Sequence, residues 1–232
     1  DINSGKVRRG AETIKNEFSK LSHVANITVS SRVPGEWKDI PRVKVKNENI
    51  STSGGNDMYF FAADDQFLNT FQIELLKGRN FAAGSIADST SVIINETAAK
   101  ELGITEPAHQ TIVLTQIPGL SPKVIGIVKD FNFQSLREPV SPVVIGFQKN
   151  PIQNIDYFTV RLSTSEASAT LQQMEGIVHN IDQDHLFEYH FLEKQWDLFY
   201  REDSIRKTIF LVIAMLTIVI ACLGTCVIFK NS

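Results

Sequence analysis

Apolar residues recur at helical spacing near both ends of the polar part of the chain. Between Val7 and Leu21 successive apolar residues lie 4, 3, 4 and 3 positions apart, which places them in one stripe along a helix. The segment from Ala167 to Ile181 repeats this spacing behind a capping-box pattern. Strand-like segments accompany the two helices at 27–33, at 157–162 and, with strict alternation, at 187–191. These two helix-strand units predict one α+β layer domain assembled from the two ends of the region.

The middle of the chain has a mostly β pattern. Short apolar runs separated by turns rich in proline and glycine predict strands at 91–94, 111–115, 123–129 and 142–147, with a helix at 95–102. Strands outnumber helices in this part. We therefore interpret residues 87–150 as a mostly β insertion that splits a layer domain composed of residues 1–86 and 151–192.

The longest apolar run extends from Ile209 to Phe229. Its 21 residues carry no charged side chain, and at helical rise they span about 31 Å, close to the hydrocarbon thickness of a bilayer. We predict a membrane-spanning helix over residues 208–229, which membrane lipids would surround. Basic residues flank the run mainly on its N-terminal side. By the positive-inside rule alone, this would place the preceding part of the chain in the cytoplasm.

The segment at 193–207 connects the layer domain to the apolar run. It contains no proline or glycine, so nothing in the sequence ends a helix before the membrane. Trp196, Phe199 and Tyr200 lie at helical spacing, and Arg206 lies just before the apolar run. Trp196 is about 20 Å from the run at helical rise, too far for the interfacial aromatic belt. We predict a stiff stalk helix in which these four residues couple the membrane segment to the outer domain.

Composition excludes several classes of protein. The 232 residues carry a formal net charge of −3, so the chain has no basic excess for general nucleic-acid binding. Both cysteines, Cys222 and Cys226, lie in the apolar run, which leaves residues 1–221 without a disulfide framework or a cysteine-based zinc site. The first residue is Asp1, and we expect the chain to be part of a longer protein.

Motifs for catalysis are missing from the sequence. It contains no phosphate-binding loop, no G-x-S-x-G and no H-E-x-x-H. The one cluster of possible metal ligands comprises His179, Asp182, Asp184, His185 and His190. We interpret it as an ordinary polar turn, because His190 alternates with the aromatic residues of the expected strand and would face away. Asp64-Asp65 resembles a helix N-cap before residues 66–71 more than an acid/base pair. We predict no catalytic residue, no metal and no cofactor.

The sequence also resembles a known family. Val124-Ile-Gly-Ile-Val-Lys-Asp-Phe-Asn-Phe133, followed by Ser135-Leu-Arg137, is similar to the signature of the MacB-like periplasmic core domain of MacB/FtsX-type ABC-transporter permeases, particularly those of Bacteroidetes. Shorter matches occur on both sides of this signature, in the order in which the family has them. They lie at Ser31–Gly35, Gly78–Phe81, Val92–Glu96, Tyr189–Phe191 and Ile220–Gly224.

The resemblance implies an architecture and a location. Such permeases have four membrane helices, and a large extracytoplasmic domain lies between the first two. Residues 1–192 would form a Porter-like layer split by a Sabre-like insertion, and 208–229 would be the second membrane helix. Residues 1–207 would lie in the periplasm, anchored in the bacterial inner membrane, contrary to the simple charge count.

The resemblance also implies partners. A separate ABC ATPase would hydrolyse ATP, and a second permease subunit would complete a homodimer or heterodimer. A periplasmic adaptor or an outer-membrane protein would be a further partner. The expected role is efflux or mechanotransmission by a non-catalytic permease subunit. Two alternatives from other classes stay open: a membrane-anchored periplasmic sensor or ligand-binding module, and an anchored hydrolase, which has no nucleophile-base pattern in its favour.

Overall fold

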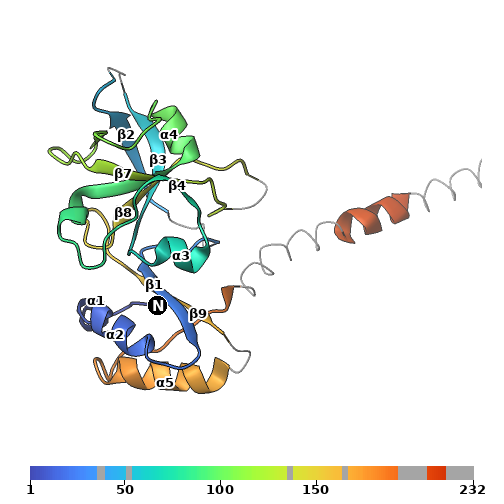
Figure 1. Cartoon of the computed structure of the whole chain (residues 1–232). Helices are drawn as coiled ribbons and strands as arrows, with labels where there is room; N and C mark the ends of the chain where they lie inside the picture. The colour runs from blue at the N-terminus through green and yellow to red at the C-terminus, as the bar shows by residue number, and fades with distance from the viewer. Residues whose placement is uncertain (36–39, 51–53, 135–137, 164–166, 193–207, 218–232) are drawn as a thin grey trace, which may run out of the picture. The chain divides into compact units, whose positions relative to one another are not determined.

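A mixed sheet runs through residues 1–188 (Figure 1). The computed structural model describes residues 1–35, 40–50, 54–134, 138–163, 167–192 and 208–217. Within these residues the sheet has nine strands, and its main path runs β4-β7-β5-β8-β3-β1-β9. Off this path, β2 pairs with β3, and β6 pairs with β2. Residues 1–188 and 189–232 form two separate units, which are described one at a time.

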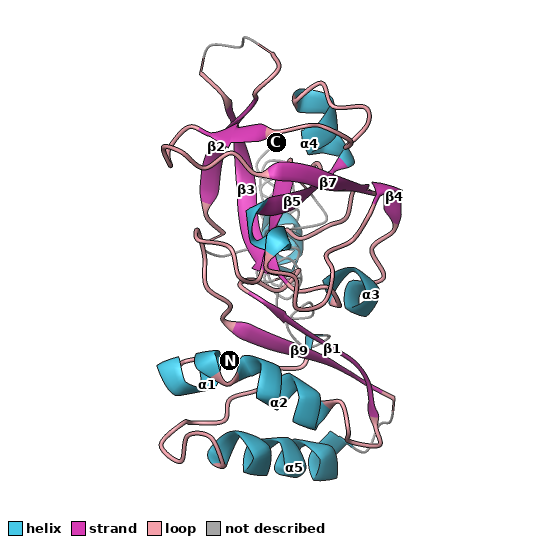
Figure 2. Ribbon diagram, turned by 60° about the vertical axis from the view of Figure 1, so that its left-hand side comes forward, coloured by secondary structure: helices cyan, strands magenta, loops and turns pink. Residues whose placement is uncertain are grey.

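The two ends of the first unit form what we call the helical layer, residues 1–30 and 155–181. Strands β1 (Val24–Ser30) and β9 (Tyr157–Leu162) pair antiparallel, with Ile27 opposite Val160. Helices α1 (Gly5–Arg9), α2 (Ala11–Phe18) and α5 (Ala167–His179) cover one side of this pair, as Figure 2 shows. Their apolar stripes meet the strands in a layer core of Ile2, Val7, Ala11, Ile14, Phe18, Ile27, Val29, Ile155, Met174 and Val178.

The first helical segment differs from the expected single helix over 7–21. Gly10 divides it into α1 and α2, and α2 ends at Phe18. A Cβ atom at Gly10 would lie 3.2 Å from Ile181 Cγ2, so glycine lets the chain after α5 approach closely at the break. Glycine is also a poor helix former, which favours a break at this position. The apolar stripe nevertheless continues across it, since Val7 and Ile14 are both buried in the layer core.

The middle of the chain forms what we call the β body, residues 40–147. Its strands are β2 (Arg42–Asn47), β3 (Asn56–Ala63), β4 (Leu75–Gly78), β5 (Ser91–Asn95), β6 (Ile112–Leu114), β7 (Lys123–Val128) and β8 (Val143–Phe147). Strands β3 and β8 run parallel, as do β5 and β7, whereas β5 and β8 are antiparallel. Helices α3 (Phe67–Phe71) and α4 (Glu96–Glu101) and the 3₁₀ turn η1 (Ala87–Thr90) complete the body.

Alternating residues of the body strands point to opposite faces of the sheet, and each face has its own core. Phe60 and Phe61 illustrate this, because they are neighbours that belong to different cores. The first core packs against α4 and includes Val45, Met58, Phe60, Val92, Ile94, Ala98, Ile112, Leu114 and Val144. The second packs against α3 and includes Phe61, Phe67, Leu68, Phe81, Ile93, Phe133, Ile145 and Phe147. Residues 40–81 therefore share their cores with residues 92–147.

Most of the predicted elements are present. The strands expected at 91–94, 111–115, 123–129, 142–147 and 157–162, and the helices at 95–102 and 167–181, correspond to elements of the structure. The strand expected at 187–191 is wrong, because residues 185–191 have no strand. Tyr189 and Phe191 are 52% and 42% exposed, and their rings pack edge to face with centroids 5.7 Å apart. Alternation of apolar residues is therefore not sufficient to predict a strand, because strand formation also depends on pairing with residues distant in the sequence.

In the second unit, residues 208–217 are helical. Thr217 Oγ1 donates a hydrogen bond to the carbonyl of Ile213, and the apolar side chains of this helix are exposed. No helix within the described residues is both long enough and apolar enough to cross a bilayer. Most of the predicted span, 218–229, lies outside the described residues.

Candidate functional site: a polar junction between the helical layer and the β body

The predicted coupling residues cannot be placed in the fold. Trp196, Phe199, Tyr200 and Arg206 all lie outside the described residues. The geometry of a functional site must therefore be sought within residues 1–188, where the buried polar groups are concentrated.

The residues of the family signature bring two distant segments together. Asp130 accepts hydrogen bonds from Asn95 Nδ2 (2.7 Å), from the Thr97 amide (3.0 Å) and from Thr97 Oγ1 (2.7 Å). Glu96 accepts from the Asp130 amide in return, and Asn95 caps α4 by accepting from the Ala98 amide. These groups satisfy amides at the start of α4 that have no partner within the helix. The signature thus fixes α4 to the end of β7.

One of the possible metal ligands near the end of α5, Asp182, has a structural role. Asp182 accepts from Ser4 Oγ (2.5 Å) and Lys6 Nζ (3.3 Å), which joins the start of α1 to the turn after α5. The hydrogen bond from Ser4 lowers the pKa of Asp182, and Lys6 adds to this effect. Burial lowers the pKa of His185. Within the described ranges, no group of three or more His, Cys, Asp or Glu side chains is arranged to hold a metal ion.

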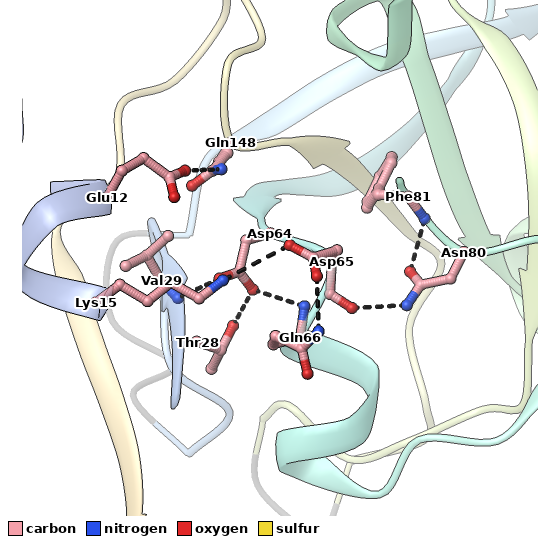
Figure 3. A network of polar contacts seen from close by, with 10 residues as sticks. All are labelled: Glu12, Lys15, Thr28, Val29, Asp64, Asp65, Gln66, Asn80, Phe81 and Gln148. Atoms are coloured by element: carbon pink, nitrogen blue, oxygen red, sulfur yellow. Dashed lines mark hydrogen bonds and ion pairs between the residues drawn. The ribbon is translucent and has the colours of Figure 1, made fainter. Parts of the chain in front are cut away.

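A buried carboxylate lies where the helical layer meets the β body (Figure 3). Asp64 follows β3, and its side chain is 0% exposed. Its oxygens accept hydrogen bonds from Lys15 Nζ of α2 (2.5 Å), from the Val29 amide (3.1 Å) and from the Gln66 amide (3.0 Å), as well as from the hydroxyl of Thr28. Three of these donors belong to the helical layer. The Gln66 contact closes a turn just before α3, whose N-cap is Gln66 and has no side-chain capping hydrogen bond, so the expected N-cap at Asp64-Asp65 lies outside the helix itself.

The Lys15–Asp64 ion pair is enclosed by protein. Only 13% of the Lys15 side chain is exposed, and Asp65 Oδ1 lies 3.6 Å from its ammonium group. Burial raises the pKa of Asp64, while Lys15 and the donors around the carboxylate oppose this rise. Burial alone would lower the pKa of Lys15, but the Asp64 carboxylate more than offsets it, so the pKa is raised. The two charges therefore stabilise each other, although for the Asp64 carboxylate burial remains the larger effect.

The ion pair is linked to the second body core. Asp65 accepts from Gln66 Nε2 (2.6 Å) through its side chain and from Asn80 Nδ2 (2.7 Å) through its carbonyl. Asn80 Oδ1 in turn accepts from the amide of Phe81, a residue of that core. A continuous series of hydrogen bonds, drawn in Figure 3, thus leads from α2 of the layer into the packed interior of the body.

Other polar contacts cross the same junction. Arg161 of β9 donates to the carbonyl of Thr70 in α3 (2.6 Å), and Gln148 Nε2 donates to Glu12 of α2 (2.6 Å). Within the layer, Asp156 accepts hydrogen bonds from Arg8 of α1 (2.9 Å) and from Arg32 just after β1 (3.1 Å). Several directional polar contacts therefore join layer and body, whose buried cores share no residue.

This arrangement suits positioning better than chemistry. Donors surround the Asp64 carboxylate, and Lys15 is held in an ion pair, so neither presents a reactive group to solvent. Sequence reasoning identified Asp64 only as a helix cap and missed Lys15 altogether. The partners are 49 positions apart, and a lysine on an amphipathic helix ordinarily belongs to the solvated face. A single sequence carries no signal that would join them.

The fold and this junction define a mixed α+β domain built from two packed parts, and comparison with known proteins gives its family. Residues 7–176 match the family described as the MacB-like periplasmic core domain. The match covers well over half of the chain, and the chain belongs to this family. No curated protein sequence matches it closely enough to count as a relative.

Solved structures show the same fold. The periplasmic region of MacB from Actinobacillus actinomycetemcomitans superposes with a TM-score of 0.54 at 16% identity, covering 90% of this chain and 89% of that one. The extracellular domain of the noncanonic ABC-type transporter YknZ from Gram-positive bacteria gives a TM-score of 0.52 at 14% identity, covering 73% of this chain and 82% of that one. The expected MacB-like resemblance is confirmed, as is a mixed, sheet-dominated α+β fold.

Proposed function

We propose that this chain is the extracytoplasmic domain, with the membrane helix that follows it, of a non-catalytic ABC-transporter permease subunit. In this role it passes movement driven by ATP hydrolysis on a partner ATPase to the periplasm, for efflux or mechanotransmission. Membership of the MacB-like periplasmic core domain family carries the proposal. The polar contacts that join helical layer and β body support it, because they would allow displacement of one part to be transmitted to the other.

The arrangement that goes with this function is also a proposal. Residues 1–207 would be periplasmic, and residues 208–229 would form the second membrane helix, reached through a continuous stalk at 193–207. The helical layer would correspond to the Porter-like part and the β body to the Sabre-like insertion. The grouping of the cores supports a first boundary near residue 31 rather than residue 86. A second permease subunit and an adaptor or outer-membrane protein would complete the assembly.

Breaking the stalk tests the proposal. The full-length permease is reconstituted in nanodiscs with its proposed partner ATPase, and a spin label is placed at the exposed Gln173 of each permease subunit. In the unmodified complex, ATP is expected to change the distance between the two labels. Tyr200→Pro should abolish this change while ATP hydrolysis persists, because proline interrupts the helix between the membrane and the outer domain.

Tyr200→Ala is the matched control, since it removes the same ring but keeps a strong helix former. It should leave the ATP-dependent distance change in place. An unchanged response in the proline variant would contradict coupling through the stalk. Loss of ATP hydrolysis together with the response would show instead that residue 200 serves assembly or the ATPase itself.

A further inference from the structure

The main-chain connection between helical layer and β body is short. Strands β1 and β3 pair at one register position, Ser30 opposite Ala63. Two neighbouring backbone hydrogen bonds accompany this pair, from Ser31 to Ala62 (2.8 Å) and from Asp64 to Val29 (3.1 Å). Within the described strands, β9 pairs only with β1 and so adds no ladder to the body. A ladder this short leaves the angle between the two parts to the side chains that cross the junction.

Among these side chains, Lys15 and Asp64 hold the central position. Asp64 extends the end of β3, and it is hydrogen-bonded at once to α2, to β1 and to the start of α3. A change in the angle between layer and body would move Lys15 and Thr28 away from the carboxylate. Because the carboxylate is fully buried, water could not replace these donors without opening the junction.

The junction is poorly suited to stabilise the fold as such. A buried ion pair loses much of its attraction to the cost of removing both charges from water, so apolar side chains of similar size often stabilise a protein as well or better. Among the described residues, the buried hydroxyls Ser30 Oγ and Thr70 Oγ1 have no hydrogen-bond partner, and both belong to elements of the junction. The ion pair instead favours one relative orientation of layer and body, because its hydrogen bonds are satisfied in that arrangement only.

We infer that the Lys15–Asp64 ion pair is an orientation lock, which fixes the angle between helical layer and β body so that the two parts move as one. The inference deepens the proposed function, since a part that transmits movement must not bend at its own joint. It is nevertheless testable without the ATPase. Removing both charges together should leave the domain folded but free the angle.

The experiment measures that angle in the full-length permease. Spin labels are placed at two exposed positions, Gln173 on α5 of the layer and Lys100 on α4 of the body, in a background without other cysteines and diluted with unlabelled permease. In the absence of ATP, the unmodified permease should give one narrow distance distribution. In Lys15→Met/Asp64→Asn, the distribution should broaden by about twofold or acquire a second maximum. The thermal unfolding midpoint of this double variant should remain close to that of the unmodified permease.

Two further variants isolate the cause. Lys15→Met alone leaves a buried carboxylate without its counter-charge and should lower the unfolding midpoint more than the double variant does. Lys129→Met/Glu74→Gln removes another lysine–carboxylate ion pair, which lies within the body and whose two side chains are each 61% exposed. This variant should leave the distance distribution unchanged. A narrow, unshifted distribution in Lys15→Met/Asp64→Asn would overturn the inference. Failure of that double variant to fold would also overturn it, by showing that the pair is needed for folding rather than for orientation.

The ion-pair experiment and the stalk experiment test different claims. A permease whose junction stays rigid without the ion pair could still respond to ATP through its stalk. A permease whose stalk variant responds normally to ATP could still have its layer and body fixed by Lys15 and Asp64. The two experiments therefore fail independently.

Discussion

Single carboxylates hold together segments that are far apart in the sequence. Asp64 and Asp130 each accept hydrogen bonds from at least two other elements, and Asp182 accepts from Ser4 and Lys6 at the start of α1. Asp88 forms a bidentate pair with Arg79: the Asp88 side chain is 1% exposed, and its two oxygens accept hydrogen bonds from Arg79 at 2.7 and 3.0 Å. Charge-assisted, bidentate pairs of this kind combine strength with a fixed geometry. These four carboxylates thus act in folding, by joining separate segments of the chain.

The Arg79–Asp88 pair predicts a dependence of stability on pH. The hydrogen bonds from Arg79 lower the pKa of Asp88 in the folded state, and the Ala82 amide contributes to this. The stabilisation is therefore fully present above the unfolded-state pKa of about 3.9 and is lost as the pH falls through the lower folded-state value. Asp88→Asn should reduce the free energy of unfolding by about 1–2 kcal/mol at neutral pH.

Urea denaturation followed by circular dichroism at a series of pH values measures this difference. The gap between wild type and Asp88→Asn should narrow as the pH falls below about 4. Asp57→Asn, at an exposed position, should show little difference from wild type over the same range. A gap for Asp88→Asn that stays constant down to low pH would contradict the role of the charge.

At the scale of elements, local pattern and tertiary packing decide different things. Strands β5 to β8 of the body were predicted, because apolar runs bounded by proline and glycine are a local signal, whereas β2, β3 and β4 were not. The edge strand β4 shows where packing takes over. It ends at Gly78, which has φ +78° and lies opposite Gly126 of β7. A Cβ atom at this position would lie 2.2 Å from the Ile125 carbonyl oxygen and 2.8 Å from Pro107 Cγ. Only glycine allows the two strands to approach this closely.

Substituting this glycine should cost far more than the backbone angle alone explains. Gly84 is a matched position, because its φ is +66° but a Cβ atom there would meet nothing within 4 Å. Gly84→Ala should cost about 1–2 kcal/mol, the strain of a left-handed conformation. Gly78→Ala should cost about 4 kcal/mol or more, because the backbone of β7 must move as well. Equal losses in chemical denaturation would show that the β4–β7 contact relaxes easily.

Elements that depend on long-range contacts were predicted less well. The helix over 7–21 is divided at Gly10 because the chain after α5 packs against its backbone there. The alternation at 187–191 does not produce a strand. The apolar stripe over 7–21 was read correctly, since Val7, Ile14 and Phe18 are buried. The alternation at 187–191 was not, because Tyr189 and Phe191, expected on a buried face, are exposed.

At the scale of the whole domain, separate cores lie on either side of the polar junction. The layer core draws only on residues 2–29 and 155–178, whereas the body cores draw on residues 40–147. Ile14 and Ile112 are both 0% exposed but belong to different cores. Side chains that share no partners are expected to contribute independently to stability.

A double-mutant cycle tests this separation. Ile14→Val and Ile112→Val should each reduce the free energy of unfolding by about 1 kcal/mol, and the double variant should show their sum within about 0.5 kcal/mol. Ile14→Val and Val7→Ala, which alter the same core, should deviate from additivity by more than this. A large coupling between Ile14 and Ile112 would mean that the two parts share packing through the junction.

The sequence by itself determined the fold class, the positions of most helices and strands, the membership of the MacB-like family and the apolar stripes of the helices near both ends of the domain. These follow from periodicity, from turn residues and from an ordered set of short motifs, all of which are local in the chain. Only the tertiary structure decided that Lys15 meets Asp64, that Asp130 caps α4 and that residues 40–81 pack with residues 92–147. The physical reason is that a buried charge or a shared core depends on partners brought together by folding, and their separation along the chain leaves no periodic trace.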